Sequence, residues 1–277
     1  MRVIVYAPDY NAKHALILRS LAEGIPGSEV RSLGDYSPSD VSVIFGVVKR
    51  SFSHTHAKQP IIDASNRGES RLIVVESAFI LRGKYWNVGW GGINGAANFR
   101  VGPKTPSDRW ELLRDRGVRT SPWSRCPQGR VVVCGQLPWD TNVQDVDHLG
   151  WCRETVQWFQ DRGIPVVFRP HPRMHNPDDY GIDRSLWNTE KIRKCIFGAR
   201  AVVVWNSNSA VDAAIMGVPV IACSPDSIAR SIASRRLHDI YRLRCPSRRR
   251  WLAGLAYSQW SLDEMAEGLT WRHLNKP

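Results

Sequence analysis

The sequence predicts an α/β protein made of two Rossmann-like lobes. Short runs of Val and Ile recur along the chain, separated by segments with helical spacing, and such continuous apolar runs are typical of parallel strands buried on both faces. This alternation occurs twice, with a break at residues 83–107 and a Pro-, Ser- and Gly-rich stretch at 121–129. The length of 277 residues, with 43% hydrophobic and 23% charged residues, suits two such lobes.

The first series predicts five strands and one clear helix. The strands are expected at Val3–Tyr6, Glu29–Ser32, Val41–Val47, Pro60–Asp63 and Leu72–Val75. Apolar residues at helical spacing predict a helix over Asn11–Glu23. Residues 83–107 are rich in glycine and aromatic residues and show no period, which predicts an ordered functional loop.

The second series predicts four strands with helices between them. The strands are expected at Arg130–Cys134, Pro165–Phe168, Ala201–Trp205 and Pro219–Ala222, and the helices at Val146–Arg162, Thr189–Gly198 and Ser209–Met216. A further helix is expected over Ser261–Leu274, with acidic residues in its first turn. We therefore divide the chain into lobes at residues 1–125 and 126–257 and a C-terminal helix at 258–277.

Composition narrows the class of protein. The sequence lacks an apolar run of the ~18 to 20 residues that a membrane-spanning helix needs, and the N-terminus is typical of a first strand rather than a signal peptide. None of the six cysteines forms a C-x-x-C pair, so we expect free thiols and no structural metal. The free thiols predict the reducing cytoplasm. We also expect a monomer without a membrane partner.

The net charge of +12 indicates an anionic partner. Excess positive charge attracts polyanions such as nucleic acid, an anionic glycan or a membrane surface. A basic surface without function is the alternative interpretation.

The strongest local motif is Val202–Ala222, where a buried strand runs into Asn206-Ser207-Asn208-Ser209 and then a helix. Small hydroxyl and amide side chains at such a boundary cap the helix and leave backbone N–H groups for phosphate oxygens. Asp212 follows one turn later and suits ribose hydroxyls. An ordinary strand–helix–strand crossover with capping residues explains the same pattern.

This motif resembles the C-terminal lobe of nucleotide-sugar glycosyltransferases with the GT-B fold. The matching residues are Asn206-Ser207, Asp212-Ala213 and Gly217-Val218-Pro219-Val220-Ile221, although the family usually has Glu in place of Asp212. Arg169-Pro170-His171-Pro172-Arg173 looks like the Lys/Arg-Pro-His-Pro element of capsule-type transferases. The resemblance implies two lobes facing across a cleft, with a C-terminal helix that crosses back to the first lobe.

The resemblance also implies a donor site in the second lobe. Arg169, His171 and Arg173 are expected to neutralise a diphosphate leaving group. Gly135 and Gln136 follow the first strand of this lobe, where glycine allows close approach of the backbone to a phosphate or sugar. A UDP-sugar, with UDP-glucose first, is the expected donor, without an obligatory metal and with Mg²⁺ as a possible stimulant.

The compact length, the basic charge and the segment Ala256–Glu264 resemble bacteriophage transferases that glycosylate hydroxymethylated pyrimidines in DNA. This narrower resemblance implies double-stranded DNA as partner, a flipped-out target base, and the host cytoplasm as location. The residues proposed to hold DNA are Lys49, Arg50, Arg82 and Lys84 at phosphates, and Trp86, Trp90 and Asn94 at the base or sugar.

The general base is expected at the carboxyl end of a strand in the first lobe. Glu76 is the leading candidate, followed by Asp9 and then Asp63, and each also fits a helix cap or an ion pair. Two other functions stay open: transfer to a polysaccharide or other glycan, and a nucleotide- or DNA-binding module without catalytic activity.

Overall fold

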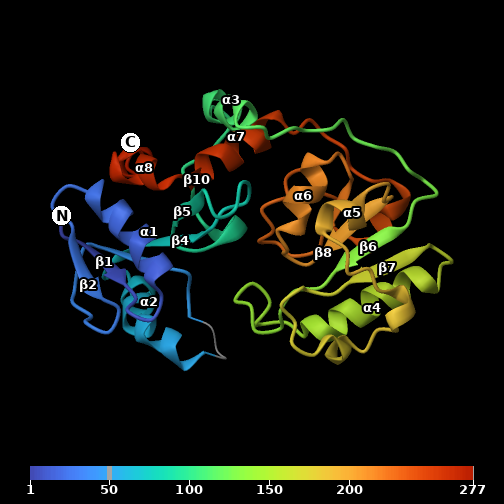
Figure 1. Cartoon of the computed structure of the whole chain (residues 1–277), viewed down its shortest axis with the longest axis horizontal. Helices are drawn as coiled ribbons and strands as arrows, with labels where there is room; N and C mark the ends of the chain where they lie inside the picture. Colours follow the sequence, from blue (N-terminus) through green and yellow to red (C-terminus); the bar gives the residue numbers. More distant parts are fainter. Residues whose placement is uncertain (49–51, 277) are drawn as a thin grey trace. The chain divides into compact units, whose positions relative to one another are not determined.

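The computed structural model describes residues 1–48 and 52–276 and divides into two compact units (Figure 1). Unit 1 combines Met1–Leu113 with the chain from Arg249 onward, and unit 2 is Arg114–Arg248. Each unit has its own sheet of mostly parallel strands, which confirms the predicted α/β class.

The sheet of unit 1 has the strand order β10-β5-β4-β3-β1-β2. Its strands are β1 (Val3–Ala7), β2 (Glu29–Ser32), β3 (Val41–Phe45), β4 (Arg71–Ser77), β5 (Trp86–Trp90) and β10 (Gln259–Trp260). The strands from β2 to β4 are parallel, whereas β5 and β10 run antiparallel at one edge. The carboxyl ends of β1, β3 and β4 therefore share one edge of the sheet.

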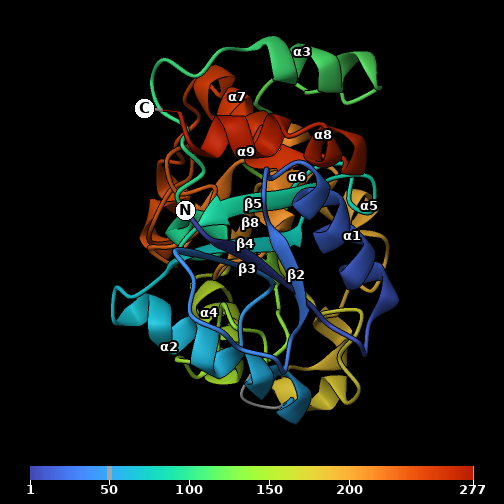
Figure 2. The ribbon, with the colours of Figure 1, turned by 90° about the vertical axis from the view of Figure 1, so that its left-hand side faces the viewer.

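Helices cover both faces of this sheet. The helices are α1 (Ala12–Glu23), α2 (Gln59–Asn66), α7 (Arg249–Ser258), α8 (Leu262–Ala266) and α9 (Leu269–Leu274), with 3₁₀ turns η1 (Ser53–Lys58) and η2 (Asn94–Ala96); α3 spans Asp108–Asp115. Alternate strand residues pack on α1, α8 and α9 on one face, and on α2 on the other. Figure 2 shows α1 and α2 on opposite sides of the strands. The C-terminal segment thus packs on the N-terminal sheet, as the fold prediction required.

Three local predictions for unit 1 are wrong. Residues 60–63 form the start of α2, not a strand, because Pro60 fits the first turn of a helix. The expected loop at 83–107 contains β5. The C-terminal helix is broken into α8 and α9 at Gly268, whose φ of 74° lies in the left-handed region.

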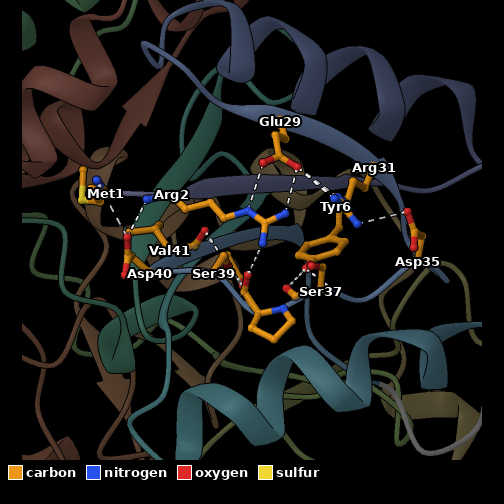
Figure 3. Close-up of polar contacts among 12 residues, drawn as sticks. Met1, Arg2, Tyr6, Glu29, Arg31, Asp35, Ser37, Ser39, Asp40 and Val41 are labelled. Carbon is orange, nitrogen blue, oxygen red and sulfur yellow. Dashed lines mark hydrogen bonds and ion pairs between the residues drawn. The ribbon is translucent and has the colours of Figure 1, made fainter.

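An ion-pair network joins Arg2, which precedes β1, to two residues of β2 (Figure 3). Arg2 Nε lies 3.0 Å from Glu29 Oε1, and Arg31 Nη2 lies 3.0 Å from Glu29 Oε2. Arg2 also donates to the Pro38 carbonyl, and the Tyr6 hydroxyl donates to the Ser37 carbonyl at 2.8 Å. Hydrogen bonds from the two guanidinium groups lower the pKa of Glu29 to about 2.

Unit 2 has a parallel sheet in the order β7-β6-β8-β9. Its strands are β6 (Val131–Cys134), β7 (Val166–Arg169), β8 (Ala201–Val204) and β9 (Val220–Ala222). Its helices are α4 (His148–Gln160), α5 (Ile192–Ile196) and α6 (Ser209–Ile215), with 3₁₀ turns η3 (Pro177–Tyr180), η4 (Arg184–Leu186) and η5 (Leu237–Tyr241). The core on the α4 face is built from strand valines with Phe159, Phe168 and Tyr180.

All six cysteines are free thiols, as expected, and Cys134, Cys152 and Cys195 are buried. Across residues 1–48 and 52–276, every helix is too short or too polar to cross a membrane.

Candidate functional site

The carboxyl ends of β6, β7 and β8 lie next to one another in the sheet of unit 2. Because the register pairs Cys134 with both Arg169 and Val204, the segments that follow these strands emerge at one edge. These segments begin at Gly135, Pro170 and Trp205. In open α/β sheets this edge is where ligands bind.

Gln136 connects the loop after β6 to its surroundings through three buried hydrogen bonds. Its side-chain Oε1 accepts from the backbone N of Asn206 at 2.9 Å. Its own backbone N donates to Nε2 of His148 at 2.8 Å, and its carbonyl accepts from the Tyr180 hydroxyl at 2.6 Å. Gln136 and Asn206 are each only 5% exposed. Gln136 therefore holds the loop after β6 against Asn206, His148 and Tyr180.

Polar side chains of β7 and α6 act electrostatically on the thiol of Cys134 at the end of β6. Ser209 forms a hydrogen bond with this thiol, and the charges of Arg169 and Asp212 act on it. Burial is the larger effect and raises the pKa of Cys134 to about 12, so the thiol stays protonated. Arg169, Ser209 and Asp212 thus all lie near the end of β6, although they come from different segments.

His171 is half-buried beside the arginines of its own loop. Burial, followed by the charge of Arg173, lowers its pKa to about 4 despite the opposing effect of Asp140. Nδ1 accepts a hydrogen bond from the backbone N of Arg173 at 3.2 Å, which places the ring proton on Nε2. The sequence prediction treated the imidazole as a source of positive charge; in this structure it is a neutral hydrogen-bond donor.

The start of α6 differs in detail from the predicted cap. Asn208 is the N-cap residue but forms no capping hydrogen bond with its side chain. Instead Ser207 Oγ accepts from the backbone N of Ser209 at 3.2 Å. The Nδ2 group of Asn206 donates to Asn142 Oδ1 at 3.5 Å, while its buried Oδ1 has no hydrogen-bond partner among the residues that the structure describes.

Gly135 is explained by packing within unit 2. A Cβ atom at this position would lie 2.9 Å from the Phe168 ring and 2.9 Å from the Tyr180 ring. Contacts between real Cβ atoms and neighbouring groups essentially never become so short. The glycine admits two core aromatic rings, a reason that differs from the predicted approach of a ligand.

In unit 1, Glu76 lies near the end of β4 and is half-buried. A Cβ atom on Gly46, which follows β3, would lie 3.4 Å from Glu76 Oε2 and 3.7 Å from Lys58 Nζ. The Lys58 side chain is buried and donates to the Phe45 carbonyl at 2.6 Å. A carboxylate and a buried ammonium group therefore flank the same glycine at the carboxyl edge of this sheet.

Two solved structures are similar to this chain over more than nine-tenths of its length. KpsC from Thermosulfurimonas dismutans, described as a β-Kdo 2,7 transferase, aligns over 97% of this chain and 98% of its own, with a TM-score of 0.58 and 13% identity. A β-Kdo 2,4 transferase of KpsC from the same organism aligns over 93% of this chain and 90% of its own, with a TM-score of 0.59 and 14% identity.

The fold is GT-B-like. UDP-GlcNAc 2-epimerase from Methanocaldococcus jannaschii overlaps less well, with a TM-score of 0.36 and 10% identity over 85% of this chain and 88% of its own. No protein-family model matches the chain. No curated protein matches it either.

The other two candidates for the general base, Asp9 and Asp63, lie in environments that differ from that of Glu76. Asp9 follows β1 at the same edge as Glu76, is exposed, and accepts a hydrogen bond from Ser32. Asp63 is not at a strand end, because it lies on α2, where it accepts from Gln59 at 2.8 Å. The position of Asp63 thus corrects the reason for which it was selected.

The residues predicted to hold DNA are dispersed. Arg82 and Lys84 are exposed in the turn between β4 and β5, at the same edge as Glu76. Trp86 and Trp90 are core residues, 6% and 7% exposed, and do not form the expected stacking surface. Asn94 follows β5 in η2, at the opposite edge of the sheet. Lys49 and Arg50 lie outside the described residues.

Sequence reasoning missed Lys58, His148 and Tyr180. His148 begins α4 and Tyr180 ends a 3₁₀ turn, and both reach Gln136 only through tertiary packing. Lys58 lies between two helical segments without any distinguishing pattern. No local signal in the sequence identifies these residues.

Proposed function

We propose that this chain is a glycosyltransferase whose unit 2 binds a nucleotide-activated sugar. The gathering of Arg169, His171, Asn206, Ser209 and Asp212 at the carboxyl edge of β6, β7 and β8 supports this proposal most strongly. Transfer of a sugar releases a nucleoside diphosphate or monophosphate, and a site for such a leaving group requires donors and positive charge.

In this proposal the arginine side chains bind phosphate oxygens, since a guanidinium group suits them in charge and shape. Arg169 has a buried Nε atom without a hydrogen-bond partner in the described chain. Neutral His171 donates from Nε2 to a further oxygen. Asp212 accepts from ribose hydroxyls. UDP-glucose is the first donor to test.

Glu76 is the proposed general base for the acceptor hydroxyl. Its carboxylate flanks Gly46 at the carboxyl edge of the sheet, where the Lys58 ammonium group flanks the same glycine. A positioned base typically contributes about 10²–10⁴-fold to the rate. Asp9 is the second candidate.

The finer proposal for the acceptor is hydroxymethylated pyrimidine in duplex DNA. The net charge of +12 supports an anionic acceptor, as do the exposed Arg82 and Lys84. Because Trp86 and Trp90 are buried, their rings do not support DNA binding by stacking on a base. An anionic glycan is the alternative acceptor with the same charge.

Two measurements test the proposal. Equilibrium binding to a panel of nucleotide-sugars comes first, with Asp212→Asn expected to weaken binding and Asp161→Asn, an exposed residue of the same unit, expected to leave it unchanged. Incubation with donor and either hydroxymethylated DNA, unmodified DNA or oligosaccharides, followed by mass spectrometry, then identifies the acceptor. Failure to bind any nucleotide-sugar would contradict the proposed function.

Glu76→Gln separates catalysis from donor binding. We expect turnover to fall by about 10²–10⁴-fold with donor affinity unchanged, since Glu76 belongs to unit 1. Full activity of this variant, together with loss of activity in Asp9→Asn, would transfer the role of base to Asp9.

A further inference from the structure

Unit 1 contains a cavity of about 670 Å³ beside the loop of residues 98–106. This size is within the range of small-ligand sites. Three cationic side chains line it: Arg100, Lys104 and Lys276. No carboxylate belongs to the described residues that form its wall. The cavity therefore has a strongly positive lining.

The loop that forms the cavity is held in a defined and strained conformation. Asn98 pairs with Trp90 through both backbone groups, at 3.0 and 2.9 Å. Arg100 has a φ of 55°, a left-handed conformation that is costly for a residue with a side chain. Its backbone N donates to Asn98 Oδ1 at 2.9 Å, and its guanidinium group donates to the Lys276 carbonyl. Strain of this kind is typical of binding loops.

The cavity also offers neutral polar and apolar groups. Asn98 also lines the cavity, and its side-chain Nδ2 group is a hydrogen-bond donor. Thr105 Oγ1 accepts from the backbone N of Gly102 at 2.7 Å and keeps its own proton for donation. Val101, which is 39% exposed, and the Tyr257 ring supply apolar surface.

The cavity is separate from the proposed base. Ser77, next to Glu76, pairs with Trp86, whereas Ile73 pairs with Trp90, where the loop is anchored. The four-residue interval along β4 corresponds to about 13 Å at the rise of a strand. The cavity therefore lies at the edge of the sheet opposite to that of Glu76.

We propose that this cavity binds an acidic saccharide unit, that is, a sugar with a carboxylate or phosphate group. Arg100, Lys104 and Lys276 match the anionic group, while Asn98 and Thr105 match hydroxyl groups. The apolar surfaces match the C–H faces of a sugar ring. A concave cavity of this size fits one compact unit better than the wide backbone of duplex DNA. The proposal does not depend on the proposed function, because it concerns binding in the absence of donor.

Calorimetric titration of the whole chain tests the proposal. Trigalacturonic acid is the carboxylated probe, glucose 6-phosphate the phosphorylated one, and maltotriose the neutral control. We expect at least one of the two acidic probes to bind and maltotriose not to bind. Lys104→Ala is expected to weaken binding roughly 10- to 100-fold, as for the loss of a hydrogen bond between charged groups. The exposed Lys13 on α1 provides the matched control, Lys13→Ala, which we expect to bind like the wild type.

Several outcomes would overturn the proposal. Equal binding of maltotriose would show that the cations are irrelevant, and equal weakening by Lys13→Ala would show a general effect of charge. Weaker binding of a 12-base-pair DNA duplex in Lys104→Ala, with no binding of either acidic saccharide, would identify a nucleic-acid contact instead. Asp212→Asn, which tests the donor site, is expected to leave saccharide binding unchanged, so the two proposals fail independently.

Discussion

Replacement of Gln136 by leucine is expected to loosen the edge of unit 2 to which the donor site is assigned. Leucine has a similar size but no acceptor, so the buried backbone N–H of Asn206 loses the partner that it has at 2.9 Å. The bonds that His148 and Tyr180 form with the backbone of Gln136 persist in the variant. One buried donor is therefore left without a partner.

An unsatisfied buried donor costs about 1–3 kcal/mol. Local opening around Asn206 should become easier by this amount, which corresponds to roughly 5- to 150-fold faster exchange of its amide hydrogen. Hydrogen exchange followed by mass spectrometry of the peptide that contains Asn206 measures this change. Donor affinity should fall as well, since Asn206 and Ser209 lose their fixed positions.

The matched control is Gln157→Leu, because Gln157 is exposed on α4 and its side chain donates to Asp161, an exposed residue of the same helix end. This variant should exchange like the wild type at Asn206. If Gln136→Leu also leaves the exchange rate of Asn206 within a factor of two of the control, the central role given to Gln136 is wrong.

Three further predictions concern stability. Burial lowers the pKa of His148 from 6.5 to about 4. Because the unfolded chain therefore binds this proton at a higher pH than the folded chain, the free energy of unfolding should fall by up to about 3 kcal/mol as the pH drops from 6.5 to 4. His148→Gln should flatten this part of the plot of stability against pH. Arg109→Ala should lower the free energy of unfolding by up to about 3–5 kcal/mol, because it leaves the Glu264 carboxylate, whose side chain is only 13% exposed, without its cation. Arg67→Ala, at an exposed ion pair, should lower it by less than about 1 kcal/mol, and similar losses in the two variants would contradict this view. Gly135→Ala should cost about 1–3 kcal/mol through contact with two aromatic rings, and Gly34→Ala, with open space around its Cβ position, should cost less; equal midpoints would refute the packing argument.

Most strands were predictable because parallel strands buried on both faces give continuous apolar runs. The error at Ile61 and Ile62 has a physical reason. A short apolar pair fits a strand and a helix equally well, and the spacing of Ile61 and Ala64, the buried residues of α2, indicates a helix only once the longer segment is considered. Pro60 also favoured the first turn of a helix.

The strand β5 was hidden by its glycine and tryptophan content. Trp86, Val88 and Trp90 alternate at the period of a strand, and all three are buried in the core. Gly89 faces the Phe99 ring, which lies 2.8 Å from the position that a Cβ atom would occupy. Aromatic residues in a glycine-rich segment therefore reflected close packing here, not an exposed binding loop.

The candidate donor residues were predictable in position because strand ends of a parallel sheet gather at one edge. The protonation state of these residues could not be predicted from the sequence. The neutral state of His171 arises from burial and from Arg173 in the folded loop. Likewise, Glu76 and Lys58 flank the same glycine only because β3 and β4 are neighbours. Such effects depend on tertiary contacts that no local pattern contains.

The assembly of unit 1 from both parts of the chain has a consequence for biosynthesis. β5 exposes one side of its backbone until β10, at Gln259–Trp260, pairs with it. During translation the ribosome must therefore release all of unit 2 before the first sheet is complete. A continuous unit 2 is expected to mature before the unit that precedes it in the gene, and nascent chains that stall near Arg248 should present an unpaired strand to chaperones.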